Sequence, residues 1–321
     1  MYVLGIDGGG TKTKGVIADR FGKVYASATV GATNQNGVEI QEVEKELSAL
    51  FTSLKNQNNQ VFSMLQAVFA GMSGADRPEE KEAMKTILEK FIPARARIII
   101  DNDAVNALYS GTLGVPGIVQ IAGTGSITFG INAKGERKRA GGWGYLIDDE
   151  GSGYDMGRAA LNSVFKAYDG RGPNTLLTQM ILKHFQVHQP PELVRFIYEA
   201  GKSRMVIAPL SQYVSAAADQ NDKVAKQIIE RTGSKLAQSI IGLSRSLFKN
   251  VSEPIPVVIV GGVFNRADLL VPIIQLKLQE QNVHVQFNKP GMAPVGGAVI
   301  AGFASIHQEI DNSFVENMKE V

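Results

Sequence analysis

The feature that most constrains the fold of this sequence is a glycine-rich turn that occurs twice. The first copy, Asp7-Gly8-Gly9-Gly10-Thr11, follows the short apolar run Tyr2–Ile6, and the second, Gly123-Thr124-Gly125-Ser126, follows the apolar run Gly117–Ala122. An apolar run that ends in such glycines is typical of a buried strand that enters a tight turn. Each turn leads into a further predicted strand. A P-loop joins a strand to a helix, so these turns are not P-loops.

The two copies belong to a longer internal repeat. A shift of 113 positions places Thr11 on Thr124 and Gly22 on Gly135, with the same strand before each Thr and the same hairpin turn after it. Such a repeat predicts two lobes that each open with a strand–turn–strand unit. We expect an N-terminal α/β lobe over residues 1–115 and a C-terminal α/β lobe with a helical insertion over 116–321. A final helix over 293–310 could pack back toward the N-terminal lobe.

Apolar periodicity predicts most of the remaining elements. Short β-branched runs indicate strands, and apolar residues three and four apart indicate helices. Beyond the strands already given, we expect strands at 13–18, 24–29, 67–70, 97–100 and 256–260, and helices at 41–54, 79–91, 161–167, 176–184, 192–199, 208–218, 223–248 and 293–306. Strands that alternate with helices in this way predict an α/β fold.

The composition excludes several classes of function. Thirty-three Lys and Arg stand against 31 Asp and Glu, so the charge gives no reason to expect nucleic acid or a membrane as a partner. The chain has no Cys, which excludes a thiol nucleophile, disulfides and a cysteine-ligated iron–sulfur cluster. The N-terminus lacks the pattern of a secretory signal, and no apolar run approaches the ~20 residues of a spanning helix. We therefore expect a cytoplasmic protein.

The glycine turns suit phosphate binding. Without Cβ atoms, successive backbone N–H groups can form a concavity that holds an anion. Thr11 and Thr124 each add a hydroxyl donor, and Asp7 could hold Mg²⁺ through water. A single turn of this kind could serve only to reverse the chain. Two copies with matched Thr residues favour two loops that clamp one polyphosphate.

Five segments of the chain resemble the motifs of the BadF/BadG/BcrA/BcrD ATPase family and are most similar to its N-acetylglucosamine kinase branch. They follow the family's order between residues 3 and 300: Asp7–Thr11, Asp101–Ala104, Ala122–Ser126, Gly141–Gly144 with Asp148–Ser152, and Val260–Asn265. The resemblance implies a two-lobed actin-like ATPase (ribonuclease H-like) fold of the actin/hexokinase/Hsp70 superfamily, with a nucleotide/sugar cleft between the lobes. It also implies ATP and Mg²⁺ as cofactors, a small-molecule sugar as substrate, and a homodimer.

The same resemblance implies roles for individual residues. Asp103 takes the place of the catalytic base, and Asp7 that of the metal ligand. The residues implied for nucleotide binding are Gly9, Gly10, Thr11, Lys12, Thr124, Gly125, Ala208, Gly262, Asn265 and Arg266. Those implied for sugar binding are Asn34, Gln35, Ser73, Asp103, Ser126, Gly142, Trp143, Gly144 and Asp149.

The chemistry of phosphoryl transfer supports the assignment of Asp103. The residue stands just past a predicted strand end, where α/β lobes place functional side chains. Transfer to a hydroxyl needs a carboxylate that orients the hydroxyl and takes its proton. The alternative is an N-cap of the helix that begins at Ala104. Asp101 is a second candidate for the base, with the same alternative.

The segment Gly141–Gly153 combines the only Trp with three consecutive acids and many glycines. We predict that these acids recognise sugar hydroxyls, because they have no basic residues near them in sequence and a carboxylate accepts bidentate hydrogen bonds. A solvated acidic turn is the alternative.

We therefore predict an ATP-dependent sugar kinase that phosphorylates an amino sugar, with N-acetylglucosamine at its 6-hydroxyl as the preferred substrate. Glucosamine and N-acetylmuramic acid stay open, because Ile127 stands where animal relatives carry a polar Asn. A non-catalytic nucleotide or sugar sensor is the alternative from another class, since a fold does not fix a function. The family's activators of 2-hydroxyacyl-CoA dehydratases need a cysteine-held cluster, and the lack of Cys excludes that activity.

Overall fold

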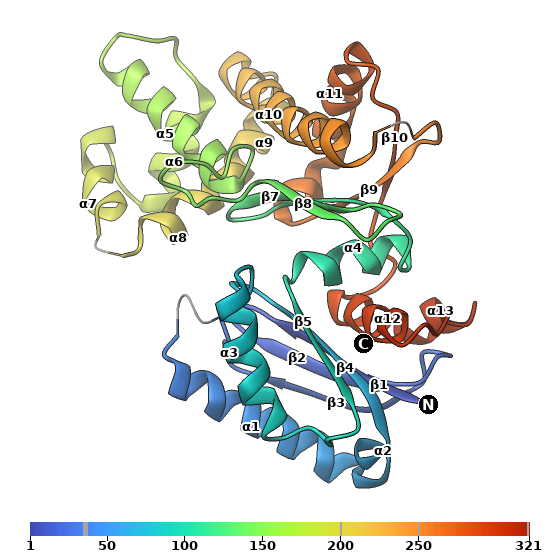
Figure 1. Cartoon of the computed structure of the whole chain (residues 1–321). Helices are drawn as coiled ribbons and strands as arrows, with labels where there is room; N and C mark the ends of the chain where they lie inside the picture. Colours follow the sequence, from blue (N-terminus) through green and yellow to red (C-terminus); the bar gives the residue numbers. More distant parts are fainter. Residues whose placement is uncertain (35–37, 200, 250, 320) are drawn as a thin grey trace. The chain divides into compact units, whose positions relative to one another are not determined.

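In the computed structural model, the N-terminal strand β1 (Tyr2–Gly8) is the central strand of the first of two sheets (Figure 1). Its neighbours are β2 (Thr13–Ala18) and β4 (Leu65–Met72), with β3 (Val24–Val30) and β5 (Arg97–Asp101) at the edges. The pairs β1–β2 and β2–β3 are antiparallel, and the pairs β1–β4 and β4–β5 are parallel. The structure describes residues 1–34, 38–199, 201–249, 251–319 and 321.

Helices cover both faces of this sheet because its strands alternate apolar side chains between two clusters. Leu4 packs with residues of α1 (Ile40–Gln57) and α3 (Pro78–Glu89). Val3, which points to the opposite face, packs with residues of α12 (Pro294–Ser305). The first sheet is therefore the middle layer of three.

The second sheet repeats the topology of the first. Its order is β10-β9-β6-β7-β8, and its strands are β6 (Gly117–Ala122), β7 (Ser126–Ile131), β8 (Arg137–Gly141), β9 (Ile255–Val260) and β10 (Val285–Asn288). When β6 to β10 are matched in turn with β1 to β5, the two orders are the same. The internal repeat predicted from the glycine turns is thus confirmed in the arrangement of the strands.

The segments after β8 are mainly helical, as expected. The helices are α5 (Gly153–Tyr168), α6 (Leu176–Phe185), α7 (Val194–Ile197), α8 (Ser203–Ile207), α9 (Ser211–Asp219), α10 (Lys223–Leu247) and α11 (Ala267–Glu280), with short 3-10 turns at Pro190–Leu193, Ala208–Leu210 and Gly262–Arg266. The buried face of α10 joins one large apolar cluster with residues of the sheet and of α5, α9 and α11. No helix among the described residues is long and apolar enough to cross a membrane.

The chain returns to its first unit at the C-terminus. One compact unit comprises residues 1–117 and 288–321, and the other comprises 118–287. The expected C-terminal lobe over 116–321 is therefore too long, because its last segment is part of the first unit. The small residues of α12 allow a close approach to α4 (Ala104–Thr112), so close that a Cβ on Gly297 would lie 1.9 Å from the carbonyl oxygen of Asn106.

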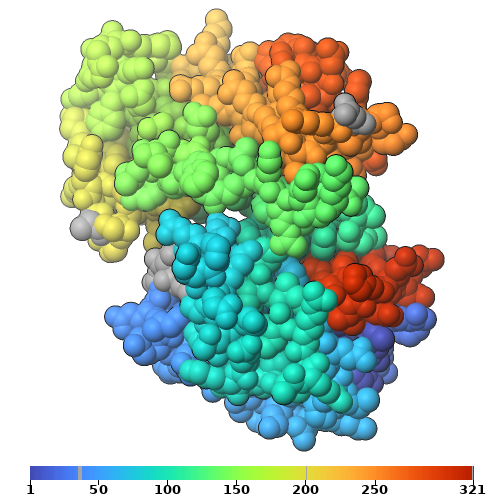
Figure 2. Space-filling view, in the orientation of Figure 1, coloured from blue at the N-terminus to red at the C-terminus, as the bar shows by residue number. Residues whose placement is uncertain are grey.

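The remaining short helices, α2 (Asn59–Ser63) and α13 (Phe314–Met318), also belong to the first unit. In the space-filling view the C-terminal segment, in red, lies against residues from the blue N-terminal part of the chain (Figure 2). Phe314 and Met318 are fully buried in the cluster that contains Val3. The C-terminal segment thus contributes to the core beneath the first sheet.

Candidate active site

Parallel strands of the first unit end at the same level. In the sheet register, Asp7 of β1 pairs with Gly71 of β4, and Gly71 pairs with Asp101 of β5. Asp103 follows two residues after Asp101, at the start of α4. The carboxyl ends of neighbouring parallel strands are where α/β sheets carry functional side chains. The carboxylates of Asp7 and Asp103 lie close enough for their charges to interact.

The side chain of Asp103 does not serve as a helix cap. In this described stretch it makes no capping hydrogen bond, although it occupies the N-cap position of α4. Asn102 fills that role instead, because its Oδ1 accepts a hydrogen bond of 2.8 Å from the N–H of Ala104. The capping alternative for Asp103 is therefore not what the structure has. The backbone N–H groups of Ala104 and Asp103 still interact with its carboxylate and act to lower its pKa.

Burial raises the pKa of Asp103 to about 7, and the neighbouring charges of Asp7 and Asp76 add to the rise. Nearby like charges and a low dielectric both disfavour the carboxylate form. A carboxylate with a pKa near neutrality suits general-base catalysis, because it is both available and basic at physiological pH.

This pKa predicts an unusual pH dependence of stability. The folded protein binds the Asp103 proton more tightly than the unfolded chain, whose pKa is near 3.8. The resulting stabilisation is complete below pH 4 and is lost as the pH rises through about 7. We expect Asp103→Asn to raise the free energy of unfolding by roughly 2–4 kcal/mol at pH 8 and by little at pH 4. Urea unfolding of both proteins at the two pH values measures this, and an equal difference at both would refute it.

Asp101 is less suited to the role of base. Its Oδ1 accepts hydrogen bonds from Lys81 Nζ at 2.9 Å and from the N–H of Asn102 at 2.9 Å, and its side chain is buried. A carboxylate held in an ion pair is stabilised in its charged form and is a weaker proton acceptor. The geometry therefore favours Asp103 over Asp101.

Asn106 is a residue of this site that the sequence analysis missed. Its Nδ2 lies 2.8 Å from Asp7 Oδ1, 3.3 Å from the carbonyl oxygen of Ile6 and 3.2 Å from that of Gly71. It is fully buried and joins α4 to the ends of β1 and β4. Asn106 lies three residues after Asp103, on the same side of the helix. That spacing is the only signal in the sequence that could have indicated it.

Other predicted residues of the first unit surround the first glycine turn. The N–H of Gly9 donates to the carbonyl oxygen of Lys12 at 3.0 Å, which closes the turn between β1 and β2. Ser73 donates its N–H to the carbonyl oxygen of Gly8 at 2.8 Å, and Asn34 Nδ2 donates to Ser73 Oγ at 3.4 Å. Gly10 and Thr11 are exposed in this turn. Gln35 lies outside the described residues.

The second glycine turn has a similar closure in the second unit. The N–H of Gly123 donates to the carbonyl oxygen of Gly125 at 2.9 Å. The N-terminus of α5 also contacts this turn, because the N–H of Gly153 donates to the carbonyl oxygen of Gly123 at 2.7 Å. The Ser126 hydroxyl donates to the carbonyl oxygen of Glu150 at 2.6 Å. The turn is thus stabilised by one hydrogen bond within it and by bonds with Gly153 and Glu150.

Two acids of the 148–150 segment have basic partners, contrary to the expectation from the sequence. Arg204 of α8 contacts Asp149 Oδ2 at 3.2 Å, and Lys235 of α10 contacts Glu150 Oε1 at 3.0 Å. Both partners are distant in sequence, so no local pattern indicates them. Burial raises the pKa of Asp149, and the charge of Arg204 opposes the rise. Asp149 has a left-handed backbone with φ of 59°, a conformation that Asp adopts more readily than most residues.

The predicted glycines next to Trp143 shape an exposed loop. Gly142 and Gly144 have φ of 73° and 100°, which a residue with a side chain adopts only with strain. The indole of Trp143 is 63% exposed, and the guanidinium carbon of Arg139 lies 3.8 Å from the centre of the ring. Arg139 therefore lies over the indole, most of which is still exposed to solvent, and the implied contact of Trp143 with a sugar stays a prediction.

Three of the predicted nucleotide-binding residues line one cavity of about 550 Å³ in the second unit. They are Thr124 from the second glycine turn, Ala208, and Gly262 after β9. The other lining residues include Met205 and Val263, so the walls are partly apolar. A cavity of this size with partly apolar walls suits a nucleoside.

Asn265 and Arg266 are not among the residues that line this cavity. The guanidinium of Arg266 contacts Asp219 at 2.7 Å and Asp268 at 2.8 Å. These ion pairs join the start of α11 to the end of α9. Arg266 thus contacts two carboxylates in the structure, and its implied contact with a nucleotide stays a prediction.

The fold of the chain is that of the actin-like ATPases. A solved structure from Chromobacterium violaceum, provisionally named an N-acetylglucosamine kinase, matches it with a TM-score of 0.69 at 24% identity, over 93% of this chain and 98% of that one. The chain belongs to the BadF/BadG/BcrA/BcrD ATPase family, whose model matches residues 4–302. The predicted fold class and family are therefore confirmed.

Two curated proteins are similar to this chain over most of their length. The N-acetylmuramic acid/N-acetylglucosamine kinase of Clostridium acetobutylicum is 34% identical over 84% of this chain and 87% of its own. The N-acetyl-D-glucosamine kinase of Dictyostelium discoideum is 32% identical over 94% of this chain and 98% of its own. Both names describe kinases of amino sugars.

Proposed function

We propose that this chain is an ATP-dependent kinase of an amino sugar, with N-acetylglucosamine as the preferred acceptor at its 6-hydroxyl. The observation that carries the proposal is the carboxylate of Asp103, which has a pKa of about 7, makes no capping bond and lies beside Asp7 at the ends of parallel strands. The names of the two curated relatives support the choice of substrate class.

Asp103 acts as the base in this proposal. It accepts a hydrogen bond from the sugar hydroxyl and orients the oxygen toward the γ-phosphate. It takes the proton as the new O–P bond forms, while the bond from the γ-phosphorus to the bridging oxygen breaks and ADP leaves. Asn34 and Ser73 are the residues of the same unit that we expect to bind the sugar. In the second unit, Ser126, Asp149 and the loop at Trp143 are the expected sugar contacts.

The two glycine turns and the cavity of the second unit bind the nucleotide in this proposal. Backbone N–H groups of Gly10 and Gly125, with the hydroxyls of Thr11 and Thr124, donate to phosphate oxygens. Gly9 closes the first turn, because its N–H donates to the carbonyl oxygen of Lys12. Ala208 and Gly262 contact the adenosine, which fits the cavity that they line. Lys12 adds a positive charge near the phosphates.

The residues present fit a magnesium ion held mainly by phosphates and water. No group of three or more His, Cys, Asp or Glu in the described part of the chain could hold a metal ion by itself. Mg²⁺ in kinases commonly uses one or two carboxylates and substrate phosphates, and the side chain of Asp7, oriented by Asn106, offers one such carboxylate. The ion would neutralise charge on the phosphates when bound.

A panel of acceptor sugars tests the function. Purified protein with ATP and Mg²⁺ is expected to form ADP fastest with N-acetylglucosamine, measured against glucosamine, N-acetylmuramic acid and glucose. Mass and NMR spectra of the product identify the phosphorylated hydroxyl. If N-acetylmuramic acid or glucosamine reacts faster, that sugar is the preferred substrate, and the protein is still an amino-sugar kinase. No phosphorylated sugar, together with measurable binding of ADP, would favour the sensor.

A further inference from the structure

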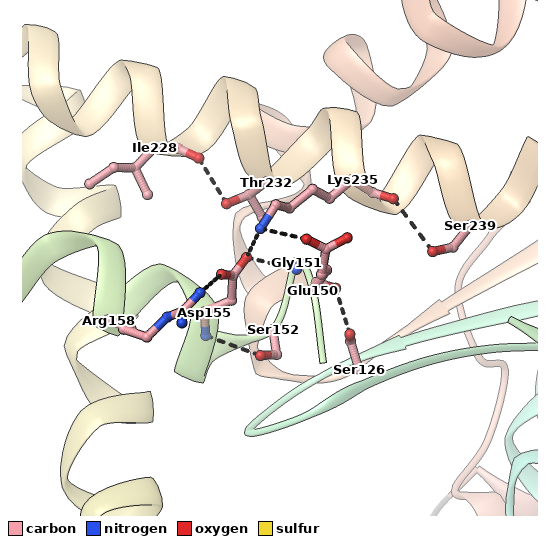
Figure 3. A network of polar contacts seen from close by, with 10 residues as sticks. All are labelled: Ser126, Glu150, Gly151, Ser152, Asp155, Arg158, Ile228, Thr232, Lys235 and Ser239. Atoms are coloured by element: carbon pink, nitrogen blue, oxygen red, sulfur yellow. Dashed lines mark hydrogen bonds and ion pairs between the residues drawn. The ribbon is translucent and has the colours of Figure 1, made fainter. Parts of the chain in front are cut away.

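Lys235 of α10 is the centre of a polar network beside the second glycine turn (Figure 3). Its Nζ lies 3.0 Å from Glu150 Oε1 and 2.9 Å from Asp155 Oδ2. Only 10% of its side chain is exposed, and that of Asp155 is 14% exposed. One ammonium group therefore joins α10 to both the loop before α5 and the first turn of α5.

The segment that Lys235 holds is bonded directly to the second glycine turn. The carbonyl oxygen of Glu150 accepts a hydrogen bond of 2.6 Å from the hydroxyl of Ser126. Two residues of α5 donate their N–H groups to the turn, Gly153 to the carbonyl oxygen of Gly123 at 2.7 Å and Tyr154 to that of Thr124 at 3.3 Å. A shift of the segment would therefore shift the turn.

Asp155 connects the ion pair to the backbone of this segment. Its Oδ2 accepts the N–H of Gly151 at 3.1 Å, and its own N–H donates to Ser152 Oγ at 3.1 Å. Lys235 thus binds a carboxylate that itself fixes the start of α5. Figure 3 shows these contacts meeting at Asp155, whose carboxylate in turn contacts the ammonium group of Lys235.

The segment also lies in close contact with α10 beside Lys235. Gly151 has φ of 77°, and a Cβ at this position would lie 2.6 Å from a methyl carbon of Leu236. The backbone of the loop therefore rests on the helix surface, and the ion pairs of Lys235 fix it at that place.

We propose that Lys235 is a positioning residue for the phosphate-binding turn Gly123–Gly125. The inference rests on the proposed function, because it assigns ATP phosphates to this turn. The positive charge of Lys235 also offsets part of the negative charge of two carboxylates near the turn. Without it, Glu150 and Asp155 would repel the polyphosphate, and Arg158, at 3.5 Å from Asp155 and largely exposed, would compensate only in part.

Replacement of Lys235 by Met tests the proposal, because Met keeps much of the side-chain volume and removes the charge. We expect the Kd for ADP, measured by calorimetry, and the KM for ATP to rise about tenfold, as for the loss of a partly buried charge pair. Lys235→Arg is expected to keep both within about threefold of wild type. Lys226→Met is the matched control, since Lys226 is an exposed lysine of the same helix whose Nζ contacts Asn221 Oδ1.

A role in folding alone would give a different result. It would lower Tm and the active fraction of Lys235→Met while the Kd for ADP and the KM for ATP kept their wild-type values, and that outcome would overturn the proposal. Adding Glu150→Gln to Lys235→Met is expected to recover at least threefold in ADP affinity, because one unpaired carboxylate is removed. No recovery would contradict the electrostatic part of the proposal.

The proposal stays testable if Lys235→Met does not fold. Glu150→Gln alone changes a half-exposed side chain and keeps the Lys235–Asp155 pair that holds the segment. Because it removes one carboxylate that repels the polyphosphate, it is expected to tighten ADP binding about twofold. An unchanged or higher Kd in this variant would then contradict the proposal. If the wild type binds ADP but phosphorylates no sugar, the proposed function fails. If it phosphorylates sugars and Lys235→Met binds ADP normally, only the inference fails.

Discussion

Asp103→Asn is expected to lower kcat by about 10²–10⁴-fold, the usual contribution of a general base. The Kd values for ATP and for the sugar should stay within about threefold of wild type, because Asn keeps the shape and most hydrogen bonds of Asp. Initial rates under saturating substrates, with calorimetry of each ligand, measure the two effects separately. A variant that kept the wild-type kcat would show that Asp103 is not the base.

Asp101→Asn distinguishes the two aspartates. The partly buried ion pair of Asp101 with Lys81 predicts that this variant loses stability. We expect the folded fraction to keep a kcat within about tenfold of wild type. A much greater loss of kcat in Asp101→Asn than in Asp103→Asn would instead show that Asp101 is the catalytic base. Melting temperatures of both variants at pH 7 show whether a loss of rate comes from unfolded protein.

Gly297→Ala is expected to cause the largest loss of stability among the substitutions considered. The new Cβ would lie 1.9 Å from the carbonyl oxygen of Asn106 and 2.7 Å from the N–H nitrogen of Ser110, both in the backbone of α4. Backbone cannot move aside as a flexible side chain can, so α4 and α12 must separate. We expect the free energy of unfolding to fall by about 3 kcal/mol.

The effect of Gly297→Ala should also reach the active site. The displaced helix begins just after Asp103 and carries Asn106, which orients Asp7. We therefore expect a lower kcat/KM in the folded fraction, about tenfold. Gly242→Ala in α10 is the matched control, because no atom lies within 4 Å of its added Cβ, and it should raise stability by up to about 1 kcal/mol. Urea unfolding of both variants provides the comparison, and equal midpoints would contradict the prediction.

The local patterns of the sequence predicted much of the fold. Both ends of β2 and β6 agree with the predicted strands, because each is an apolar run bounded by glycines or a turn. α5 begins at Gly153, eight residues before the predicted helix, since Ser152 caps a helix that opens with glycines. No helix was expected at α11, whose interior contains Pro272. Packing overrode local propensity in both places.

The candidate site was predictable only where its residues follow strand ends or glycine turns. Asp7, Asp103 and Thr124 have such positions. Asn106 and Lys235 lie within helices instead. The sequence gives no local sign of their roles, because their partners are about 80 to 100 residues away. A polar residue on a buried helix face gives no local sign of the group that it contacts. The acids at 148–150 were misinterpreted for the same reason.

The place of α12 in the first unit has a consequence for the order in which a nascent chain folds. Ribosomes release β1 to β5 first, yet the face of that sheet that contains Val3 and Ala67 is covered by residues near Phe303, which are made only after the whole second unit. The second unit, 118–287, is continuous and can fold in the meantime. Until α12 has been made, the first unit is expected to expose an apolar surface, and in this interval aggregation would compete with folding.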